Sequence, residues 1–595
     1  MELYLPLAKD EKLKELGLER QNKVYYNGKL LTIEEYIREK LKDSDFWAVK
    51  IALEAIERAK KKNKDLITVR CANTPTGVLH IGNANDVIRA YFIAKVIDIL
   101  GYNVRLVFTS DDRDPMRGFP SKIADKYGNI VDFKEKHEYE QKYDGFPVAR
   151  IPDPFKCHSS WSEHFISIYF KEFELLGIID NIRFEYYSPS ILYNTGLWEN
   201  LVKKALENKD KINEILREHK EHVREYPFSV ICENCNRIGS THVINYNPKT
   251  KEVEYICESR HLKKKTIQGC GYKGKTTIRN GKLDWYVEWA MDWAYFDTDV
   301  EPMGKDHYVS SWKISPKIAK EVFNIEPPIP VVYEFFTVDG KKMSGSKGNI
   351  YNLTEFLKIM EKEVVLYLYT KRPTTHRDIK MENIPSLVKE YDELEKKVLL
   401  HLSGENKIEN EEIIVYYLTK GSIPKEIPKK IEYSTAAIIG QIVLPKEYLI
   451  NTHLPIKFEE EVLERIKRAF DRINIPLKDY NLERLRKATY WAITYGPERV
   501  KIKPNYERIT IPLDKNELQA LEKIIEYLEK MKHYDMEEIQ TSIHNIIKEH
   551  TDPKKFYPKL YKMLINKEQG PKIASLIIAL GKEEIIKILS NYQKS

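Results

Sequence analysis

The stretch Thr74-Pro75-Thr76-Gly77-Val78-Leu79-His80-Ile81-Gly82-Asn83 decides how the chain folds. A short apolar, β-branched run precedes it at residues 66–69, and apolar residues recur at helical spacing after it, from Val87 to Leu100. We therefore predict a buried parallel strand, a turn and a helix, followed by a second strand over residues 104–108. Such a βαβ unit binds ligands at the carboxyl ends of its strands, where helix N-termini favour anions.

The residue types of this turn fit a nucleotide. Thr76 and Gly77 belong to a tight turn, and His80 stands at the predicted start of the helix, where an imidazole can donate to a phosphate. Gly82 has no side chain, so a flat base or a ribose could lie against the backbone. The alternative is an ordinary strand–turn–helix junction that Thr76 caps.

A second stretch, Lys341-Lys342-Met343-Ser344-Gly345-Ser346-Lys347-Gly348-Asn349, is a glycine- and serine-rich loop that carries three lysines. Such a loop can close over a triphosphate and stabilise the charge that moves onto the departing pyrophosphate. On its own, a basic loop of this kind is more often a solvated turn. Residues 331–336 before it have the pattern of a last inner strand of the sheet, which would deliver the loop to the site.

Length and composition limit the class of protein. A chain of 595 residues is too long for one core, so we expect two to four domains. The net charge is only +7, so binding to a nucleic acid would need a local basic patch. The N-terminus is charged and no apolar run approaches the roughly 20 residues that span a bilayer, so we expect a cytoplasmic protein. Six cysteines in such a chain favour metal binding or free thiols over disulfides.

Two clusters of metal-ligating residue types occur in the chain. In the clearer one, a CxxC knuckle at Cys232 and Cys235 is followed by Cys257 and by a Gly-Cys-Gly knuckle at Cys270, which is the layout of a zinc ribbon. His261 competes with Cys270 as the fourth ligand, and free thiols are the alternative. The other cluster offers four nitrogen, sulfur and oxygen donors, enough for a tetrahedral Zn²⁺ site. Its members are Asp153, Cys157, His158 and His164.

The segment Leu283–Trp293 carries three tryptophans among acidic residues. As a strand, it would place Trp285, Val287 and Trp289 on one face and Glu288 on the other. An aromatic wall beside a carboxylate suits a cationic side chain through cation–π contact and ion pairing. A packed aromatic layer is the alternative.

Further polar residues follow the predicted strands. Residues 111–114 could place Mg²⁺ or the amino group of a substrate, or they could cap the next turn. Asp306 and His307 could hold ribose hydroxyls or the substrate. Residues 402–430 carry helix breakers and are predicted to be a linker or a loop-rich segment, whereas the tail from Leu518 to Leu580 has helical periodicity.

Taken together, His80-Ile81-Gly82-Asn83 and Lys342-Met343-Ser344-Gly345-Ser346 resemble the two signatures of class I aminoacyl-tRNA synthetases, usually written HIGH and KMSKS. Asn83 replaces the last histidine and Gly345 the second lysine, and Lys347 can supply the missing charge. With Pro152-Asp153-Pro154, the tryptophan segment and Gly304-Lys305-Asp306-His307, the chain resembles the archaeal-type class I lysyl-tRNA synthetases from about Thr68 to Tyr369.

This resemblance implies an α/β fold: a Rossmann-type class I synthetase catalytic domain with an inserted zinc-binding subdomain and an all-α C-terminal domain. The expected order is a helical N-terminal extension over residues 1–65, a catalytic domain over 66–350 with its zinc-binding insertion at about 113–280, a stem-contact segment over 351–400 and an α-helical anticodon-binding domain over 401–595.

The resemblance also implies an activity, which is ATP-dependent aminoacylation of tRNA(Lys) with L-lysine through a lysyl-adenylate. It implies that activation depends on bound tRNA. The implied partners are tRNA(Lys), L-lysine and ATP, and the implied cofactors are Mg²⁺ and one or two structural Zn²⁺ ions. Arginyl- and glutamyl-tRNA synthetases share both signatures and stay an alternative, as does a non-catalytic tRNA-binding paralogue.

The motifs and the resemblance together assign residues to roles. Catalytic roles fall to His80, Asn83, Lys342 and Lys347. ATP contacts fall to Thr76, Gly77, His80, Gly82, Asn83, Gly304, Asp306, Met343, Ser344 and Ser346. Lysine contacts fall to Thr74, Trp285, Glu288, His307 and Tyr333. Zinc ligands are Asp153, Cys157, His158 and His164 in one site, and Cys232, Cys235, Cys257 and Cys270 in the other, where alignment from Trp285 favours Cys270 over His261.

Two positions depart from the family pattern near the lysine pocket. Ala72 stands where the family usually has glycine, and Glu288 stands where it usually has aspartate. Either change could shrink the pocket or move the carboxylate.

Overall fold

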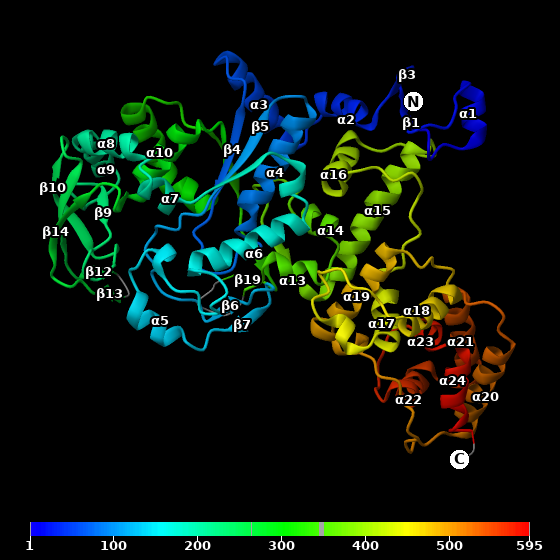
Figure 1. Ribbon diagram of the computed structural model, residues 1–595. Helices are drawn as coiled ribbons and strands as arrows, with labels where there is room; N and C mark the ends of the chain where they lie inside the picture. The colour runs from blue at the N-terminus through cyan, green and yellow to red at the C-terminus, as the bar shows by residue number, and fades with distance from the viewer. Residues whose placement is uncertain (1, 263–264, 344–349, 594–595) are drawn as a thin grey trace. The chain divides into compact units, whose positions relative to one another are not determined.

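The structure is a computed structural model that describes residues 2–262, 265–343 and 350–593 (Figure 1). The chain divides into two compact units, and each is described by itself. Unit 1 comprises Met1–Glu355, Leu366–Ile379 and Leu400–Ile423, and unit 2 comprises Phe356–Val365, Lys380–Leu399 and Pro424–Ser595.

Unit 1 is built on a five-stranded parallel sheet with the strand order β17-β16-β4-β5-β8. Because β4 comes first along the chain and lies in the middle, the order of the strands reverses between β4 and β16. In open sheets of this kind, ligands bind at that reversal point, outside the carboxyl ends of the strands. The strands are β4 (Ile67–Ala72), β5 (Val104–Thr109), β8 (Phe184–Tyr187), β16 (Val300–Gly304) and β17 (Ile329–Tyr333).

The predicted βαβ unit is confirmed: β4 pairs in parallel with β5, and helix α4 (Ala84–Ile99) connects them. The helix is buried along almost its whole length because it packs on β4, β5 and β16, while α3 (Trp47–Lys61) covers it. The prediction that His80 opens the helix is wrong, because α4 begins one turn later, at Ala84. His80 instead forms an isolated antiparallel bridge with Asn352.

The long segments between the strands carry small elements of their own. Before β8 these are β6 (Lys122–Ala124), β7 (Ile130–Asp132), α5 (Lys136–Tyr143) and α6 (Trp161–Leu175). Between β8 and α10 they are α7 (Pro189–Asn194), α8 (Glu199–Glu207), α9 (Lys209–Arg217), β9 (Phe228–Val230), β10 (Thr241–Asn247), β11 (Glu252–Cys257), β12 (Arg260–Leu262), β13 (Lys265–Ile267), β14 (Lys273–Thr277) and β15 (Gly281–Leu283).

The tryptophan segment forms helix α10 (Trp285–Phe296), so its prediction as a strand is wrong. Trp285, Trp289 and Trp293 recur every four residues, which places them on one face of a helix. The rings of Trp285 and Trp289 stack, and the ring of Trp293 is tilted against that of Trp289. The short alternation of Trp285, Val287 and Trp289 also fits a strand, and this coincidence misled the sequence prediction.

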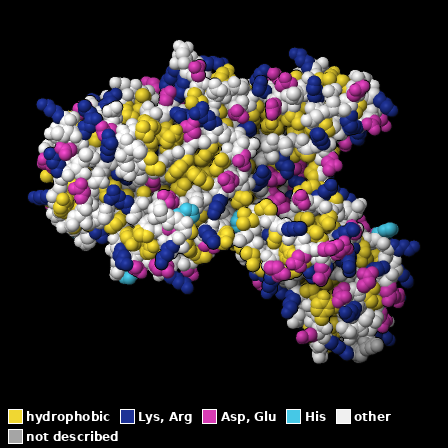
Figure 2. All heavy atoms as spheres, viewed as in Figure 1, with side chains coloured by type: hydrophobic (Ala, Val, Ile, Leu, Met, Phe, Trp, Pro, Cys, Tyr) yellow, Lys and Arg dark blue, Asp and Glu magenta, His cyan; other side chains and the backbone are white. Residues whose placement is uncertain are grey.

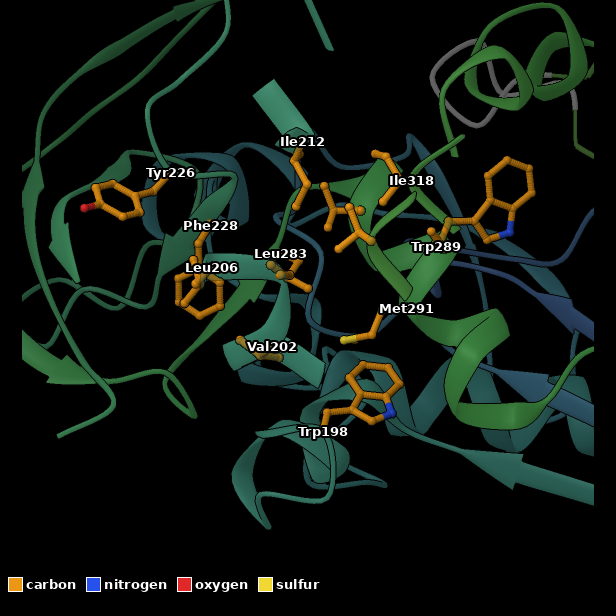
Figure 3. Close-up of a cluster of buried hydrophobic side chains, with 14 of the residues drawn as sticks. Trp198, Val202, Leu206, Ile212, Tyr226, Phe228, Leu283, Trp289, Met291 and Ile318 are labelled. Carbon is orange, nitrogen blue, oxygen red and sulfur yellow. The ribbon is translucent and has the colours of Figure 1, made fainter. Parts of the chain in front are cut away.

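A buried apolar cluster joins α10 to the inserted segment (Figure 3). In Figure 3, Val202 of α8, Ile212 of α9, Leu283 of β15 and Met291 of α10 face a common interior. The side of α10 away from the sheet is therefore fixed by the insertion, so the insertion and the parallel strands share one folded core.

The strand predicted over residues 331–336 corresponds to β17, which lies at the edge of the sheet, so its prediction as an inner strand is wrong. The chain then enters a separate three-stranded sheet with the order β19-β18-β20. Its strands are β18 (Phe336–Val338), β19 (Lys341–Lys342) and β20 (Arg377–Ile379), and between β16 and β17 lie α11 (Lys305–Val309) and α12 (Ser315–Ile318).

The N-terminal residues are only partly helical, contrary to the expectation of a helical extension. Besides α1 (Asp10–Leu16), α2 (Ile33–Lys42) and α3, they hold an antiparallel sheet of β1 (Glu2–Tyr4), β2 (Val24–Tyr26) and β3 (Lys29–Leu31). The segment predicted as a linker also contains a helix, α16 (Asn410–Lys420), in which a capping box at Glu409 and the left-handed Gly421 define the ends.

Unit 2 is helical in its described part, and the helical periodicity of the tail is confirmed. A buried arginine stabilises it: Arg484 donates to Glu361 and to both carboxylate oxygens of Asp392, at 2.6–2.8 Å. Its helices are α17 (Tyr433–Val443), α18 (Glu460–Arg472), α19 (Asp479–Thr494), α20 (Lys515–Lys530), α21 (Met536–His550), α22 (Pro553–Ile565), α23 (Ile573–Leu580) and α24 (Lys582–Ser590). Helices α13 (Leu353–Leu357), α14 (Lys362–Tyr367) and α15 (Ile384–Leu402) run across the unit boundaries.

Within the described residues, no helix is both long enough and apolar enough to cross a membrane.

A buried acid in unit 1 makes its stability depend on pH. Glu172 on α6 accepts hydrogen bonds from the backbone N–H and the hydroxyl of Thr354, at 3.0 and 2.8 Å. Burial raises the pKa of Glu172 to about 8. Between the ordinary pKa and this value, the folded chain holds a proton that the unfolded chain releases, so stability falls as pH rises, by about 1.4 kcal/mol per pH unit.

We predict that Glu172→Gln removes this part of the pH dependence. Urea unfolding between pH 5.5 and 7.5 should give the wild type the steeper loss of unfolding free energy. Glu174→Gln, an exposed position on the same helix, should behave like the wild type. Equal slopes for the wild type and Glu172→Gln would contradict the assignment.

Candidate functional site

A cavity of about 950 Å³ opens at the carboxyl ends of the parallel strands in unit 1, and we call it the central pocket. The last residues of β4, β16 and β17 line it, namely Ala72, Gly304 and Tyr333. The pocket therefore lies at the reversal point of the strand order, where the fold predicts a ligand.

The first motif forms one wall of the central pocket. The Nδ1 atom of His80 accepts a hydrogen bond from the backbone N–H of Asn83 at 3.2 Å, which leaves Nε2 to carry the proton. Burial lowers the pKa of His80 to about 4, and the charge of Lys342 adds to this effect. A Cβ atom on Gly82 would lie 3.1 Å from the His80 ring and 3.3 Å from Met343. Neutral His80 is thus a preformed hydrogen-bond donor. The space beside its ring is open because Gly82 has no side chain.

Strand β19 brings Lys342 to the same wall. Its Nζ atom lies 3.6 Å from the centroid of the Phe335 ring, and its side chain is exposed. Ser344, Ser346 and Lys347, which the sequence also predicts to act on ATP, lie outside the described residues.

Most of the residues predicted to contact ATP line the central pocket. The exception among the described ones is Gly77, whose carbonyl oxygen accepts a hydrogen bond from the hydroxyl of Tyr169. At Gly304 a Cβ atom would lie 2.7 Å from the carboxylate of Asp306, so a side chain there would push Asp306 out of place. The residues that line the pocket are Thr76, His80, Gly82, Asn83, Gly304, Asp306 and Met343.

An aromatic wall forms another side of the pocket. The rings of Trp285 and Trp289 stack at a centroid distance of 5.2 Å, and His307 lies 5.7 Å from Trp285 and 6.0 Å from Trp289. Thr74 and Tyr333 also line the pocket, so four of the five residues predicted to contact the amino acid come together.

Glu288 is the predicted residue that does not line the pocket. Its carboxylate is buried and already paired, 2.9 Å from the ammonium of Lys282 and 2.5 Å from the hydroxyl of Tyr193. Because Lys282 also pairs with Asp114, this lysine neutralises two acids of the region. The helical geometry of α10 turns Glu288 away from the space that a strand would have given it.

Sequence reasoning missed Asp86, which lies on the first turn of α4 and lines the pocket. Its carboxylate accepts a hydrogen bond from Tyr333, and burial together with the charges of Glu301 and Asp306 raises its pKa well above the usual range. An acid in the first turn of the predicted helix, just after the first motif, was the signal that could have found it, because the N-terminal end of that helix faces the ligand site.

Asp111 is a second acid at the base of the pocket. It has a left-handed backbone conformation, with φ of 39°, directly after β5. Burial and the like charge of Asp114 raise its pKa to about 7. Among the described residues, no lysine or arginine forms an ion pair with Asp86, Asp111 or Asp306, so the base of the pocket has an excess of acid.

A buried arginine connects the strands and the helix next to this acidic base. Arg70 of β4 donates to Glu301 of β16 at 2.6 Å and to Thr109 of β5 at 2.8 Å, and it pairs with Asp292 of α10. Glu301 also accepts from the indole N–H of Trp289 at 2.8 Å. One side chain thus connects three strands of the sheet to the aromatic helix.

Four cysteines of the insertion meet at one point. The Sγ atoms of Cys232 and Cys270 are 3.6 Å apart, and those of Cys235 and Cys257 are 3.7 Å apart. His261, the competing ligand, hydrogen-bonds Thr266 at 2.9 Å and lies outside this group. Four Zn–S bonds of about 2.3 Å in a tetrahedron require sulfur atoms about 3.8 Å apart, so these cysteines fit one Zn²⁺ ion.

The other predicted cluster also comes together, with the Sγ atom of Cys157 3.2 Å from His158 and 3.3 Å from His164. The carboxylate of Asp153 lies 3.5 Å from His164 and accepts backbone hydrogen bonds from Cys157 and His158 at 2.8 Å. Nε2 of His164 lies 2.9 Å from the carbonyl oxygen of Ala124, which leaves Nδ1 with a free electron pair toward the cluster. These four residues have the donor types of a zinc site.

Comparison with known proteins identifies a family and relatives of this chain. Residues 45–422 match the sequence profile of the family described as tRNA synthetases class I (K), and residues 503–592 match that of an anticodon binding domain. The lysine–tRNA ligase of Haloarcula marismortui is 32% identical, over 91% of this chain and 96% of the relative. That of Methanocaldococcus jannaschii is also 32% identical, over 92% and 100%.

A solved structure of a glutamate–tRNA ligase from Elizabethkingia meningosepticum aligns at 12% identity with a TM-score of 0.36, over 89% of this chain and 99% of that one.

The buried arginine gives a stability prediction. Arg70→Met leaves Asp292 and Glu301 buried without their partner, so we expect a loss of about 3–5 kcal/mol in unfolding free energy. Urea unfolding followed by the fluorescence of the α10 tryptophans measures it.

The matched control is Arg183→Met, because Arg183 pairs with Glu185 at 2.7 Å while its side chain is exposed. It should cost no more than about 1 kcal/mol. A similar loss of unfolding free energy in both variants would show that the Arg70 network contributes no more to stability than the ion pair of the control.

Proposed function

The chain belongs to the class I (K) tRNA synthetases, and we propose that it attaches L-lysine to tRNA(Lys) through a lysyl-adenylate formed from ATP. The observation that carries the choice of a basic amino acid is the acidic base of the central pocket, where no lysine or arginine among the described residues forms an ion pair with Asp86 or Asp111. Curated relatives with this activity, matched over most of the chain, support the same conclusion.

The amino-acid pocket combines a negative base with an aromatic side. Asp86 is only partly accessible, so an ammonium group that reaches it would lose most of its water. The positive charge would counteract the raised pKa of Asp86 and favour the ionised carboxylate, which then accepts a charge-assisted hydrogen bond. The Tyr333 hydroxyl holds this carboxylate in place. Trp285 and His307 would contact the aliphatic stem of lysine, and Thr74 would lie at the entrance. A carboxylate side chain would be repelled by the acids of this pocket.

We assign adenylate formation to the wall of the pocket that holds His80 and Lys342. The lysine carboxylate attacks the α-phosphorus of ATP in line, and the bond to pyrophosphate breaks. Nε2–H of His80 donates to the transferring phosphoryl group, and Lys342 stabilises the charge that builds up on pyrophosphate. A terminal hydroxyl of tRNA then attacks the carbonyl carbon of the adenylate, and AMP leaves.

Mg²⁺ supplies further charge neutralisation at the phosphates when it is bound. The groups of closely placed ligating side chains in the described part of the chain are the two cysteine- and histidine-containing clusters, which suit zinc. The acids of the pocket do not form such a group, so a Mg²⁺ ion carried in by the nucleotide would take most of its ligands from phosphate and water.

We assign both clusters to structural zinc. The four cysteines would saturate the ion and leave no position for a substrate. Asp153, Cys157, His158 and His164 offer a mixed set of ligands that would fix α6 to the loop before it. The helical C-terminal residues are proposed to bind the anticodon, which the anticodon-domain match at residues 503–592 supports, and residues 351–400 to contact the acceptor stem.

The test of the proposed function is ATP–pyrophosphate exchange with each standard amino acid, with and without tRNA(Lys). We expect exchange with lysine, and only when tRNA is present. Exchange with arginine or glutamate would overturn the pocket assignment, and no exchange with any amino acid would favour a non-catalytic paralogue.

Asp86→Asn removes the charge proposed to bind the ammonium group. We expect the KM for lysine to rise about 10- to 100-fold, because a hydrogen bond to a charged group contributes about 1.5–3 kcal/mol, while the KM for ATP stays the same. Asp98→Asn, an exposed position on the same helix, is the control. A rise in the KM for ATP instead would place Asp86 with the nucleotide.

Lys342→Ala removes the charge proposed to act on pyrophosphate. We expect adenylate formation to slow by about 10²–10³-fold with little change in lysine binding, since this charge acts on the transition state. Single-turnover kinetics and equilibrium binding separate the two effects. Lys341→Ala, the exposed neighbour on β19, is the control, and equal losses in rate and lysine affinity would contradict the role.

A further inference from the structure

The first motif is held in place by residues that follow the second motif in the chain. The backbone N–H of Ile81 donates to the carbonyl oxygen of Tyr351 at 3.0 Å, and the hydroxyl of Tyr369 donates to the carbonyl oxygen of Ile81 at 2.8 Å. Tyr369 comes directly after α14, in the part of unit 1 that begins at Leu366. Both backbone polar groups of Ile81, the residue next to His80, are therefore bonded to residues far along the chain.

Two side chains of α4 connect the same motif to the backbone of Tyr369. Asn85 donates to the carbonyl oxygen of Gly82 at 3.0 Å and accepts a hydrogen bond from Nε of Arg89 at 2.9 Å. The Nη1 atom of Arg89 donates to the carbonyl oxygens of Tyr369 and Lys371, at 3.1 and 3.2 Å. Together with the hydroxyl of Tyr369, these bonds form a closed ring that begins and ends at the first motif.

Arg89 differs from the charged side chains of the surface. On the face in Figure 2, lysine and arginine side chains are interspersed with aspartate and glutamate, whereas Arg89 is only 1% exposed. No carboxylate in the described part of the chain pairs with it, and burial lowers its pKa to about 9. A buried charge without an ion pair is costly unless its hydrogen bonds are made. The oxygen atoms of Asn85, Tyr369 and Lys371 must therefore stay in place around it.

The ring of Tyr369 is fixed from the side of the second motif. It stacks on the ring of Phe336, with 5.1 Å between the centroids and an angle of 29° between the planes. Phe336 begins β18 and lines the central pocket, and β18 pairs with β19, which carries Lys342. One tyrosine thus contacts the first motif through its hydroxyl and the strand next to Lys342 through its ring.

Trp47 of α3 secures the other side of this ring of hydrogen bonds. Its indole N–H donates to the carbonyl oxygen of Thr370 at 2.8 Å. The centroid of its ring lies 5.0 Å from the guanidinium of Arg89, which allows a cation–π contact. The backbone around Tyr369 is therefore held from two directions.

The orientation of His80 depends on the backbone that this ring holds. The carbonyl oxygen of His80 accepts from the backbone N–H groups of Asn83 and Ala84 at 2.9 and 3.0 Å, and its Nδ1 atom accepts from Asn83 as well. The peptide of Ile81 lies between these groups, so a shift of this peptide would move the imidazole. In a reaction that depends on positioning, a displacement of about 1 Å can cost about 10²-fold in rate.

We propose that Tyr369, supported by Asn85 and Arg89, is a positioning residue for adenylate formation. Its hydroxyl holds the peptide of Ile81 and thereby directs Nε2–H of His80 at the transferring phosphoryl group. Tyr369 is fully buried and does not line the central pocket, so it acts through His80 and touches neither substrate. The inference rests on the proposed function, in which His80 donates to that phosphoryl group.

The test is Tyr369→Phe in the full chain, which removes the hydroxyl and keeps the ring that stacks on Phe336. Single-turnover kinetics with ATP, lysine and tRNA(Lys) gives the rate constant of adenylate formation, and the amplitude gives the fraction of active enzyme. We expect the rate constant to fall about 10- to 100-fold, while the amplitude and the Kd for lysine keep their wild-type values. A lower amplitude with an unchanged rate constant would show a purely structural role and overturn the proposal.

A double-mutant cycle tests whether Tyr369 acts through His80. When His80→Ala has removed the imidazole, there is no donor left for the hydroxyl to direct. Tyr369→Phe should then change the remaining rate constant less than about twofold, although it has a large effect in the wild type. Losses that multiply in the double variant would overturn the proposal.

Tyr36→Phe is the matched control. Tyr36 is also fully buried, and its hydroxyl donates to Glu2 among the N-terminal residues, outside the site. Its loss removes a comparable buried hydrogen bond and should leave the rate constant unchanged. If Tyr369→Phe fails to fold, Asn85→Ala opens the same ring of hydrogen bonds at Gly82 and should lower the rate constant with full amplitude.

The wild type separates the two levels of the argument. A wild type that forms lysyl-adenylate, with Tyr369→Phe and Asn85→Ala at the same rate, would overturn the positioning role and leave the proposed function intact. An equal fall in rate constant for Tyr36→Phe and Tyr369→Phe would overturn it too. A wild type that forms no lysyl-adenylate in the presence of tRNA(Lys) would overturn the proposed function and this inference with it.

Discussion

The buried guanidinium of Arg70 is the interaction on which the rest of unit 1 depends. It reaches Thr109 on β5, Glu301 on β16 and Asp292 on α10, and all of these groups are buried. Breaking such a network leaves buried charges without partners, so the strands and the aromatic helix must keep one arrangement. That arrangement fixes the carboxyl ends of β4 and β16, and with them the position and the acidic base of the central pocket.

Charge is sorted around this pocket by the fold. The base collects acids, the wall at the first motif presents neutral His80 with Lys342, and the insertion contributes basic side chains such as those of Arg224 and Arg260. In the proposed function, the ammonium group of lysine and the triphosphate of ATP would therefore occupy different sides of one cavity. Two reactants placed in this way would not compete for the same charges, which suits a reaction that depends on positioning and electrostatics.

Prediction from the sequence succeeded where local pattern and local chemistry agree. The strand, helix and strand around His80 and Gly82 are present, as are the helices of the tail, because their apolar spacing reflects burial on one side. The cysteine spacing likewise predicted four residues that meet. Prediction failed for the segment from Trp285, because its residues fit the periodicity of a strand as well as that of a helix. It also failed for β17, because the place of a strand in the sheet depends on pairing with strands that are distant in the sequence.

The sequence by itself determined the reacting motifs, the βαβ unit and the residue types of both metal clusters, since these depend on neighbours in the chain. Tertiary structure alone decided which charges stay unpaired. Glu288 is neutralised by Lys282 and Tyr193, while Asp86, absent from every motif, lies at the base of the pocket without a cationic partner among the described residues. The physical reason is that electrostatic pairing acts through space between residues far apart in the chain, so only the folded arrangement determines which acid is available to a ligand.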